Sequence, residues 1–342
     1  MKQKLTTLLF SLSLLVATGC REFYDYFNDV EPEILKVREY ASGLTTPLGL
    51  YLDAKEQLWV TEVGTANNDG KVSVIMPNGT KHVVIEGFSS FMGPGGPEEI
   101  AGLNHLLLKN GLLYILHANG LLYKANISSF DPEDAPLQAS ALATENIAAF
   151  VLNYDFEEDV VESNPYNLTS GPGGDLYITD AAANAVIRRS SNGQLSVFAT
   201  FPDIANPIPV GPPTIDFVPT SIAFNGQNFY VTSLTGFPFP TGKARIYSVD
   251  LSGKISLYQE GFTTITDMTF DPVNNPVVVE YAQFTLEGGY NANTGRIVVA
   301  AQDGQSTLVS GINLPTAIVR SGLLTYYVNS LADGKIFKVT AQ

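Results

Sequence analysis

The stretch PYNLTSGPGGDLYITDAAANAVIRRSSNGQLSVFAT, residues 165–200, decides the fold. It contains four short runs rich in β-branched, aromatic and other apolar residues: PYNLTS, LYITD, AVIRR and LSVFAT. Turns rich in Gly, Asn, Asp and Ser separate several of these runs, as in GPGGD and SSNG. Runs of this kind between turn residues predict antiparallel strands joined by tight connections. The stretch therefore predicts one four-stranded antiparallel sheet.

The same pattern recurs six times along the chain. In each repeat the second run ends in a polar residue, and these endings are spaced by 55, 63, 53, 47 and 49 residues. The six endings are Glu62, His117, Asp180, Ser233, Glu280 and Asn329. Sheets of four strands repeated at a period of about fifty residues are typical of β-propellers. The sequence thus predicts an all-β fold, a six-bladed β-propeller of four-stranded antiparallel blades.

The last repeat supplies only three strands and ends at GKIFKVT, residues 334–340. The stretch ILKVREYASGL, residues 34–44, resembles the outer strands of the other repeats. We expect this N-terminal strand to pair with the C-terminal blade, because closing the ring removes exposed sheet edges. Residues 34–342 are therefore predicted to form a single propeller domain.

Residues 1–19 are predicted to be a lipoprotein signal peptide. A start with two lysines, MKQK, precedes an apolar run of secretory-signal length, LTTLLFSLSLLVA. The run leads into VATGC, whose Cys20 is the only cysteine, and small residues before a lone cysteine resemble a bacterial lipobox. An ordinary signal peptide with an incidental cysteine is the alternative. With Cys20 lipidated, residues 20–33 become an anchor or linker, and we expect a lipid-anchored protein of the bacterial cell envelope, periplasmic or surface-exposed.

The charge of the chain excludes one class of partner. The 342 residues carry a net charge of −15, and loss of the signal peptide with its two lysines leaves 17 basic and 34 acidic residues, a charge of −17. Such a surface repels nucleic acid and anionic lipid headgroups. We expect no nucleic-acid partner and a membrane attachment that rests on lipid chains.

Two insertions interrupt the repeat. Residues 131–162 contain nine acidic residues and no Lys or Arg, which suits a solvated acidic surface or, alternatively, a cation site. Within them, TENIAAFVLNY (residues 144–154) has apolar residues at helical spacing and predicts a short helix capped by Thr144. The second insertion, residues 202–219, is rich in proline and predicts an extended loop.

The strand directions place every long loop on one face of the propeller. Turns between first and second strands, and between third and fourth strands, are minimal, whereas the second-to-third loops and the blade crossings are long. Binding residues usually lie on long loops of a rigid scaffold. One such loop, SLTGFPFPTGKARIY (residues 233–247), carries Phe237 and Phe239 between prolines. The two rings are predicted either to pack on neighbouring loops as a lid or to wall a binding face.

The same geometry gathers polar residues at one mouth of the central channel. The expected set joins the second-strand ends with the starts of the innermost strands: Glu62, His105, His117, Asn167, Asp180, Ser233, Asp267, Glu280 and Asn329. These residues either satisfy strand ends in a water-filled channel or bind a ligand. Glu62, Asp180 and Glu280 are the candidate ligands of Ca²⁺ or another divalent cation. A two-residue turn at residues 110–111 would pair Asn104 with His117 and turn His105 to the opposite sheet face.

No motif of an established catalytic class is present. The chain lacks a GxSxG elbow, a Walker loop, an HExxH motif and paired cysteines. Its repeats resemble six-bladed lactonases of the gluconolactonase type, which bind a cation through carboxylates and asparagines at the innermost-strand starts. The matching positions here are Leu48, Asn104, Tyr166, Thr220, Thr266 and Thr316, and only Asn104 is ligand-like.

Longer stretches resemble the ScyD/ScyE family, named for proteins of scytonemin biosynthesis loci. The resemblance spans roughly residues 36–340 and is carried by the stretches at 144–150, 162–193, 218–250 and 258–272, with TGFPFPTGKARIY the most specific. It implies an exported propeller without a defined reaction. We therefore expect a non-catalytic protein that binds a small molecule, a glycan or an envelope protein on its long-loop face. A metal-dependent hydrolase or lactonase is the alternative.

Overall fold

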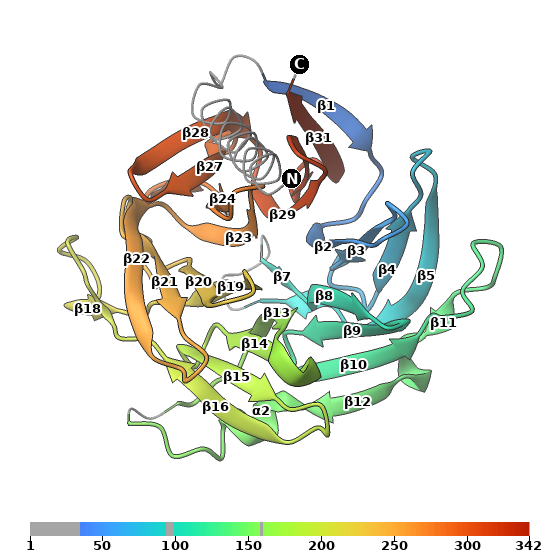
Figure 1. The fold of residues 1–342 in the computed structure, drawn as a ribbon, viewed down its shortest axis with the longest axis horizontal. Coiled ribbons are helices and arrows are strands. Elements are labelled where there is room, and N and C mark those ends of the chain that lie inside the picture. Colours follow the sequence, from blue (N-terminus) through green and yellow to red (C-terminus); the bar gives the residue numbers. More distant parts are fainter. Residues whose placement is uncertain (1–34, 94–98, 158–159, 342) are drawn as a thin grey trace, which may run out of the picture.

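The computed structural model describes residues 35–93, 99–157 and 160–341. Six sheets stand around a central axis, each with its innermost strand nearest the axis (Figure 1). The predicted all-β, six-bladed propeller is confirmed. The predicted signal peptide (residues 1–19), the predicted lipidation site Cys20 and the predicted linker over residues 20–33 lie outside the described residues.

Each blade has four main strands, which follow one another from the axis outward. Blades 1 to 3 are β2 (Pro47–Leu52), β3 (Leu58–Glu62), β4 (Gly70–Ile75) and β5 (Lys81–Phe88); β8 (Leu103–Lys109), β9 (Leu112–His117), β10 (Leu121–Asn126) and β12 (Ala143–Asn146); β13 (Pro165–Ser170), β14 (Leu176–Asp180), β15 (Ala185–Arg189) and β16 (Leu195–Thr200). Blades 4 to 6 are β19 (Pro219–Phe224), β20 (Phe229–Ser233), β21 (Ala244–Val249) and β22 (Ile255–Phe262); β23 (Ile265–Phe270), β24 (Pro276–Glu280), β27 (Gly295–Ala301) and β28 (Gly304–Ile312); β29 (Pro315–Ser321), β30 (Thr325–Ser330), β31 (Lys335–Ala341) and β1 (Leu35–Ala41).

The N-terminal strand closes the ring as predicted. β1 pairs antiparallel with β31, in a register that places Leu35 opposite Ala341 and Val37 opposite Val339. The first described strand thus becomes the outermost strand of the last blade, so the two ends of the propeller hold each other.

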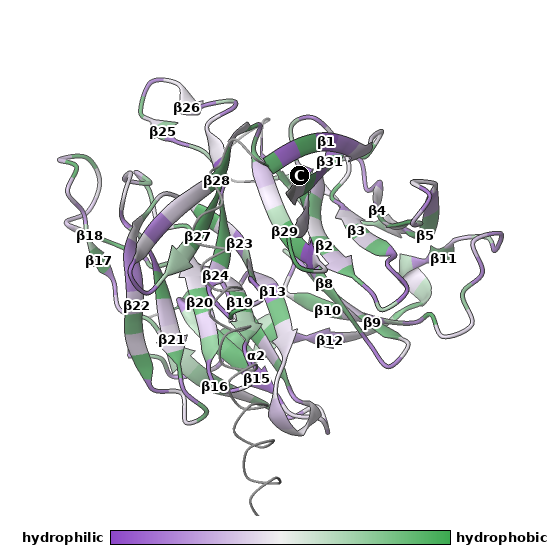
Figure 2. Ribbon diagram, turned by 45° about the horizontal axis from the view of Figure 1, so that its top comes forward, coloured by the Kyte–Doolittle hydropathy of each residue, from purple (hydrophilic) through white to green (hydrophobic). Residues whose placement is uncertain are grey.

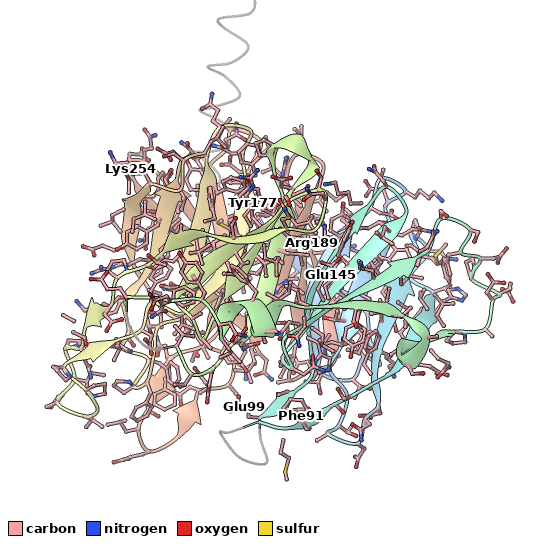
Figure 3. All side chains as sticks on the ribbon, turned by 90° about the horizontal axis from the view of Figure 1, so that it is seen from below. Phe91, Glu99, Glu145, Tyr177, Arg189 and Lys254 are labelled. Atoms are coloured by element: carbon pink, nitrogen blue, oxygen red, sulfur yellow. The ribbon has the colours of Figure 1, made fainter. Side chains whose placement is uncertain are left out.

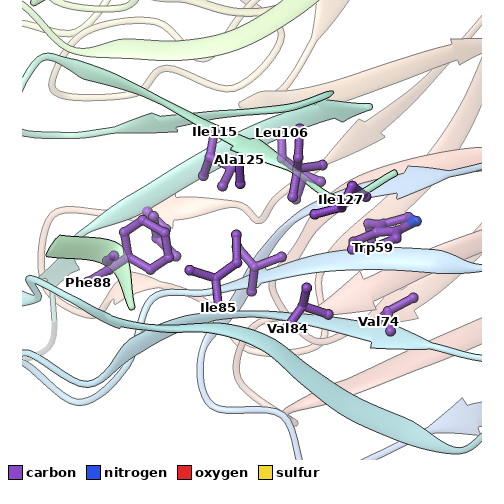
Figure 4. Packing of buried hydrophobic residues seen from close by; sticks show 13 residues of the cluster. Trp59, Val74, Val84, Ile85, Phe88, Leu106, Ile115, Ala125 and Ile127 are labelled. Atoms are coloured by element: carbon purple, nitrogen blue, oxygen red, sulfur yellow. The ribbon is translucent and has the colours of Figure 1, made fainter. Parts of the chain in front are cut away.

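The blades pack on one another through apolar side chains on both sheet faces. Between blades 1 and 2, a cluster that includes Trp59, Ile85, Phe88, Leu106 and Ile115 fills the space between the sheets (Figure 4). Equivalent clusters lie between the other blades. In Figure 2, hydrophobic colours follow inner strands such as β29, while hydrophilic stretches lie on the outer strands β1 and β22. Among the described helices, none is long and apolar enough to cross a membrane.

Every innermost strand carries a register shift near its start. In β13, for example, Pro165 pairs with Asp180 but Asn167 pairs with Thr179. The predicted pairing of Asn104 with His117 is therefore wrong: Leu103 pairs with His117, and the regular register of the turn resumes only at Leu106. An extra residue on one strand of a pair bends that strand and re-aims its side chains.

The acidic insertion completes blade 2. The predicted helix over 144–154 is reduced to one turn, α2 (Ile147–Val151), and residues 143–146 form the fourth strand β12 instead. The cap is Asn146, whose side chain accepts a hydrogen bond from the Ala149 amide, so the prediction of Thr144 as the cap is wrong. Ahead of it, β11 (Leu137–Gln138) pairs in parallel with β5, and η2 (Ala139–Ala141) follows. The insertion thus covers the outer edge of blade 1.

The long loops form small hairpins of their own. They are β6 (Phe91–Met92) with β7 (Ile100–Ala101), β17 (Ile204–Ala205) with β18 (Thr214–Ile215), and β25 (Phe284–Thr285) with β26 (Gly289–Tyr290). The proline-rich insertion, predicted to be an extended loop, contains the second of these hairpins. Figure 3 shows Phe91 and Glu99 on one face and Lys254 on the opposite face. We call the face with these hairpins the loop face and the opposite one the short-turn face, whose first-to-second turns include η3 (Pro172–Gly174) in blade 3.

Candidate functional site

Two of the predicted carboxylates bind the segment of chain that leads into the first strand of their own blade. The buried Glu62 accepts a hydrogen bond from the Thr45 amide at 2.7 Å, and the buried Glu280 accepts one from the Thr263 amide at 2.9 Å. The Arg296 guanidinium lies 2.6 Å from the other Glu280 oxygen. Burial raises the pKa of Glu280, although the Thr263 amide and Arg296 act in the opposite direction. Both carboxylates therefore hold the crossing segment against the second strand.

Asp180 plays the same part in blade 3. It accepts hydrogen bonds from the Ser163 hydroxyl at 2.5 Å, the Asn164 amide at 2.9 Å and the Ala183 amide at 3.1 Å. Glu62, Asp180 and Glu280 each bind groups of their own blade. Within residues 35–93, 99–157 and 160–341, no three His, Cys, Asp or Glu side chains gather as metal ligands. The structure does not bring these three carboxylates into one cation site.

The polar ends of the other second strands also bind nearby backbone. The Ser233 hydroxyl accepts a hydrogen bond from the Arg245 amide at 2.9 Å. The Asn329 side chain accepts from the Ala317 amide at 2.8 Å and donates to the Leu48 carbonyl at 2.9 Å. Both side chains are fully buried. These residues join strands within blades 4 and 6, and Asn329 also joins blade 6 to blade 1.

His117 is held in one tautomer by its surroundings. Its Nε2 lies 2.9 Å from the Ser89 carbonyl oxygen, and its Nδ1 accepts a hydrogen bond from the Asn119 amide at 3.0 Å. A ring that accepts at Nδ1 donates from Nε2 when neutral. Burial lowers the pKa of His117, opposed by the hydrogen bond to Ser89. The neutral imidazole therefore bridges the crossing segment and the second strand.

A different set of predicted residues does come together at the axis. The Asn167 amide donates to Asp267 Oδ1 at 3.0 Å, and the Ser221 hydroxyl donates to the same oxygen at 2.8 Å. The Ile318 amide donates to Asp267 Oδ2 at 3.0 Å. These residues belong to the innermost strands β13, β19, β23 and β29, which surround the channel (Figure 1). Asn167, Ser221 and Asp267 thus form a buried hydrogen-bonded group that spans three blades.

His105 occupies the same position in the second blade. It is 2% exposed, and its Nε2 has no hydrogen-bond partner among the described residues. Its ring lies 5.1 Å from that of Tyr166, and burial lowers its pKa to about 3. In the first blade this position is Gly49, where a Cβ atom would lie 2.7 Å from His105 Cα. His105 is therefore a neutral imidazole in the channel, separate from His117.

The lactonase-like positions serve another purpose here. Three threonines and Asn104 donate across the blade boundary to a carbonyl at the start of the next innermost strand. The bonds are Asn104 to Pro165 (3.0 Å), Thr220 to Ile265 (2.7 Å), Thr266 to Pro315 (3.2 Å) and Thr316 to Pro47 (3.1 Å). These hydroxyl and amide groups donate to carbonyl oxygens of the next blade and so join neighbouring blades. None of these four residues is a carboxylate that could bind a cation. The residues present do not fit the cation site of that lactonase type.

An aromatic wall stands on the loop face. The Phe239 ring lies 5.0 Å from Phe284 and 5.3 Å from Tyr290, and Tyr290 lies 5.0 Å from Tyr281. Phe237 lies 6.0 Å from both Phe239 and Phe284 and remains 48% exposed. We call these five residues the aromatic wall. Its members come from the Phe237 loop of blade 4 and from the β24–β27 loop of blade 5, which contains the β25–β26 hairpin.

The sequence pattern identifies two of these five residues, Phe237 and Phe239, and leaves out Tyr281, Phe284 and Tyr290. A signal for the other three is present, because they lie in one long loop of the same face, YAQFTLEGGY. The Phe237 and Phe239 rings pack on that neighbouring loop, and Phe237 also faces solvent.

Tyr166 connects the channel to the aromatic wall. Burial raises its pKa, and the nearby charges of Asp267, Tyr281 and Tyr290 raise it further. Burial likewise raises the pKa of Tyr281 to about 12, with a contribution from the charge of Glu99. Tyr166 thus lies within electrostatic reach of both groups. We call His105, Tyr166, Asn167, Ser221 and Asp267, together with the aromatic wall, the channel-mouth site.

Among the titratable groups of this site, Asp267 has the pKa closest to pH 7. Burial raises its pKa to about 6, while hydrogen bonds from Ile318 and Ser221 oppose that shift. A carboxyl group with such a pKa exchanges its proton within the physiological range. The channel-mouth site can therefore take up one proton at Asp267, and its aromatic wall offers rings on which a ligand can stack.

Comparison with known proteins gives a fold and no family. No family model matches the chain, and no curated protein does. A gluconolactonase from Xanthomonas campestris is 11% identical with a TM-score of 0.57, covering 90% of this chain and 90% of that one. The aldose sugar dehydrogenase of Streptomyces coelicolor is 13% identical with a TM-score of 0.58, covering 90% and 97%. Virginiamycin B lyase from Staphylococcus aureus is 14% identical with a TM-score of 0.52, covering 90% and 99%. At these identities, the chain shares the β-propeller fold of these enzymes.

Proposed function

We propose that the protein binds a small molecule or glycan at the channel-mouth site without catalysis. The observation that carries this proposal is an aromatic wall next to a buried polar group, on the face that carries the long loops. Ligand sites of proteins are mostly apolar and aromatic, with a few placed polar groups that fix orientation. The proposal thus rests on the aromatic wall and the buried polar group together, and neither of them alone would support it.

The chemistry of the site favours a ligand with an apolar face and hydroxyl groups. Rings such as Phe239 and Tyr290 offer flat apolar surface, and the Phe237 ring extends that surface to solvent. The two tyrosines of the wall, Tyr281 and Tyr290, also carry hydroxyl groups that can form polar contacts. A sugar ring has both an apolar face and hydroxyl groups, so a glycan matches this surface well.

The test is saturation-transfer NMR with methyl glycosides of the common hexoses and the purified full chain. We expect saturation transfer to at least one glycoside and its loss in Phe239→Ala. Tyr154→Ala is the matched control, because Tyr154 is an exposed aromatic residue outside the site. If no glycoside receives saturation, or if both variants behave like the native chain, the glycan proposal fails. If the native chain instead binds a protein, and this binding is lost when the Phe237 loop is changed, a protein partner replaces the glycan as the proposed ligand.

Hydrolysis of a lactone is the second candidate. The similarity to a gluconolactonase and to a sugar dehydrogenase favours it, while the threonines at the innermost-strand starts count against a cation site of that type. The test is the release of acid from glucono-δ-lactone by the full chain, with and without added Ca²⁺. A rate above the uncatalysed rate that falls in Asp267→Asn would replace the binding proposal with this one.

We also propose that the protein is exported and anchored to the cell envelope through Cys20, as the resemblance to the ScyD/ScyE family and the lipobox suggest. Labelling of cells with radioactive palmitate tests this proposal. Label should enter the native chain and be absent from Cys20→Ala.

A further inference from the structure

A cavity of about 330 Å³ lies far from the channel-mouth site, on the short-turn face. It is bounded by the β23–β24 turn, the β27–β28 turn, the end of the β29–β30 turn and the start of β1. Its floor is the apolar cluster between blades 5 and 6. The volume falls at the lower end of the range of small-molecule sites, about 300 to 1,000 Å³. Nothing in the proposed function uses this cavity.

Tyr326 gives the cavity a polar group. Its side chain is 2% exposed and belongs to the cluster between blades 5 and 6, yet it lines the cavity. In the described chain, the Tyr326 hydroxyl is not among the fully buried side-chain atoms that lack a partner, so it opens onto the cavity that Tyr326 lines. A ligand in the cavity would form a hydrogen bond with this hydroxyl.

The other polar groups of the cavity are acidic or neutral. Asp271 is buried and held in place, because it accepts hydrogen bonds from the Val273 amide at 2.9 Å and the Asn275 amide at 2.8 Å. Asp303 is a second carboxylate of the lining, and no Lys, Arg or His of the described chain lines the cavity. Burial raises the pKa of Tyr326 most, the charge of Asp271 raises it further, and the charge of Arg320 acts in the opposite direction. Arg320 does not line the cavity, whereas Asp271 and Asp303 do, so the charges of the lining favour a cation.

The remaining wall is apolar. Leu35, Val299, Leu308 and Leu324 line it, and the first three also pack on the cluster below. We propose that this cavity binds a small primary amine with a short apolar tail. The ammonium group lies between the Tyr326 hydroxyl and the Asp271 carboxylate, and the tail rests on the leucines and valine. The negative net charge of the chain adds to the attraction of a cationic ligand.

Isothermal titration of the full chain with benzylamine, benzyl alcohol and benzoate tests this assignment. The three probes share a ring and differ in charge. We expect benzylamine to bind best and benzoate not at all. Tyr326→Phe should weaken benzylamine about tenfold, since it removes a hydrogen bond to a charged group. Tyr327→Phe is the matched control, because Tyr327 follows directly in β30 but packs in the cluster with Tyr40 on the other side of the blade.

A second variant fixes the location of the bound amine. Ala301→Phe places a ring in the cavity from the end of β27 and should abolish benzylamine binding without changing glycoside binding at the channel mouth. Equal binding of benzoate and benzylamine would overturn the proposal. So would unchanged benzylamine binding in both Tyr326→Phe and Ala301→Phe, each checked for a native melting temperature. Failure of glycoside binding alone leaves the cavity proposal intact, because the two sites lie on opposite faces.

Discussion

Asp267 shows how a buried carboxyl group balances two opposing effects. Burial favours its protonated form, while the donors Asn167, Ser221 and the Ile318 amide favour the carboxylate. Burial prevails, and the pKa rises to about 6 from its ordinary value of 3.8. The folded protein therefore binds this proton more tightly than the unfolded chain does. The stability that results is fully present below pH 3.8 and is lost as the pH rises through 6.

This difference predicts a pH-dependent effect of Asp267→Asn, which removes the titrating group. Lowering the pH from 7 to 5 should stabilise the native chain relative to the variant by about 1 kcal/mol, given the two pKa values. Urea unfolding of both proteins at the two pH values measures the change. The result is contradicted if the stability gap between them is the same at pH 7 and pH 5.

Glu280 is predicted to act on stability and not on ligand binding. Glu280→Ala leaves the Thr263 amide and the Arg296 guanidinium without their acceptor, so the free energy of unfolding should fall by about 2 to 4 kcal/mol. Urea unfolding measures the loss. Glu287→Ala, in an exposed loop of the same blade, is the control and should change little. A change in Ca²⁺-induced melting shift without a loss of stability would point to a cation role instead.

At the scale of single residues, the sequence predicts where a side chain lies in the fold better than it predicts which groups that side chain contacts. The spacing of the repeats places Glu62, Asp180 and Glu280 correctly at strand ends. It does not show that each carboxylate turns to its own crossing segment, because that choice depends on amides such as Thr45 that are remote in sequence. The bulge in each innermost strand has no sequence signal of its own, so the pattern does not predict the register at Asn104.

Single elements are held by contacts between blades, and Glu145 of β12 is the clearest case. It binds Lys124 of β10 at 2.6 Å and Arg189 of β15 at 2.5 Å, through two oxygens. The hydrogen bond from Arg189 lowers the pKa of Glu145, with Lys124 adding to the effect. One acid of the insertion thus ties the fourth strand of blade 2 both to its own sheet and to blade 3.

Removal of this carboxylate should loosen one element without unfolding the molecule. In Glu145→Ala we expect faster amide hydrogen exchange across β12 and α2, because a network of a bidentate arginine and a lysine is lost. Exchange in β13 and β14 should stay slow. Glu133→Ala, an exposed acid of the same insertion, serves as the control. If the two variants show the same exchange in β12, the ion pairs do not hold the strand.

The insertion also marks the limit of prediction at the level of elements. ATEN has no apolar alternation, and the following apolar residues fit a helical spacing, so the sequence favours a helix over a strand. The strand forms because β10 offers an open edge, with Tyr123 opposite Thr144. The other blade strands carry an apolar or β-branched pattern that predicts them. β12 takes its conformation from a neighbour instead of from its own composition.

At the scale of the whole molecule, the propeller separates two surfaces. Crossings and second-to-third loops build the loop face with its aromatic wall, and the tight turns build the opposite face with the cavity at Tyr326. The chain enters the propeller at Leu35, on the short-turn face. The start of β1 and the aromatic wall thus lie on opposite faces of the propeller.

The closure of the ring is predicted to depend on β1. Leu35 packs on the cluster between blades 5 and 6, and Ala41 packs on the cluster between blades 6 and 1, so this strand stabilises both. A chain that begins at residue 45 loses these contacts and exposes the edge of β31. Its melting temperature should fall, and a synthetic peptide of residues 34–44 should restore it in a concentration-dependent way, because the peptide binds only the folded ring. A peptide with prolines in place of Val37 and Arg38 should not restore it, since proline cannot donate to the ladder. Equal melting of the truncated chain with and without the native peptide would show that the ring closes through other contacts.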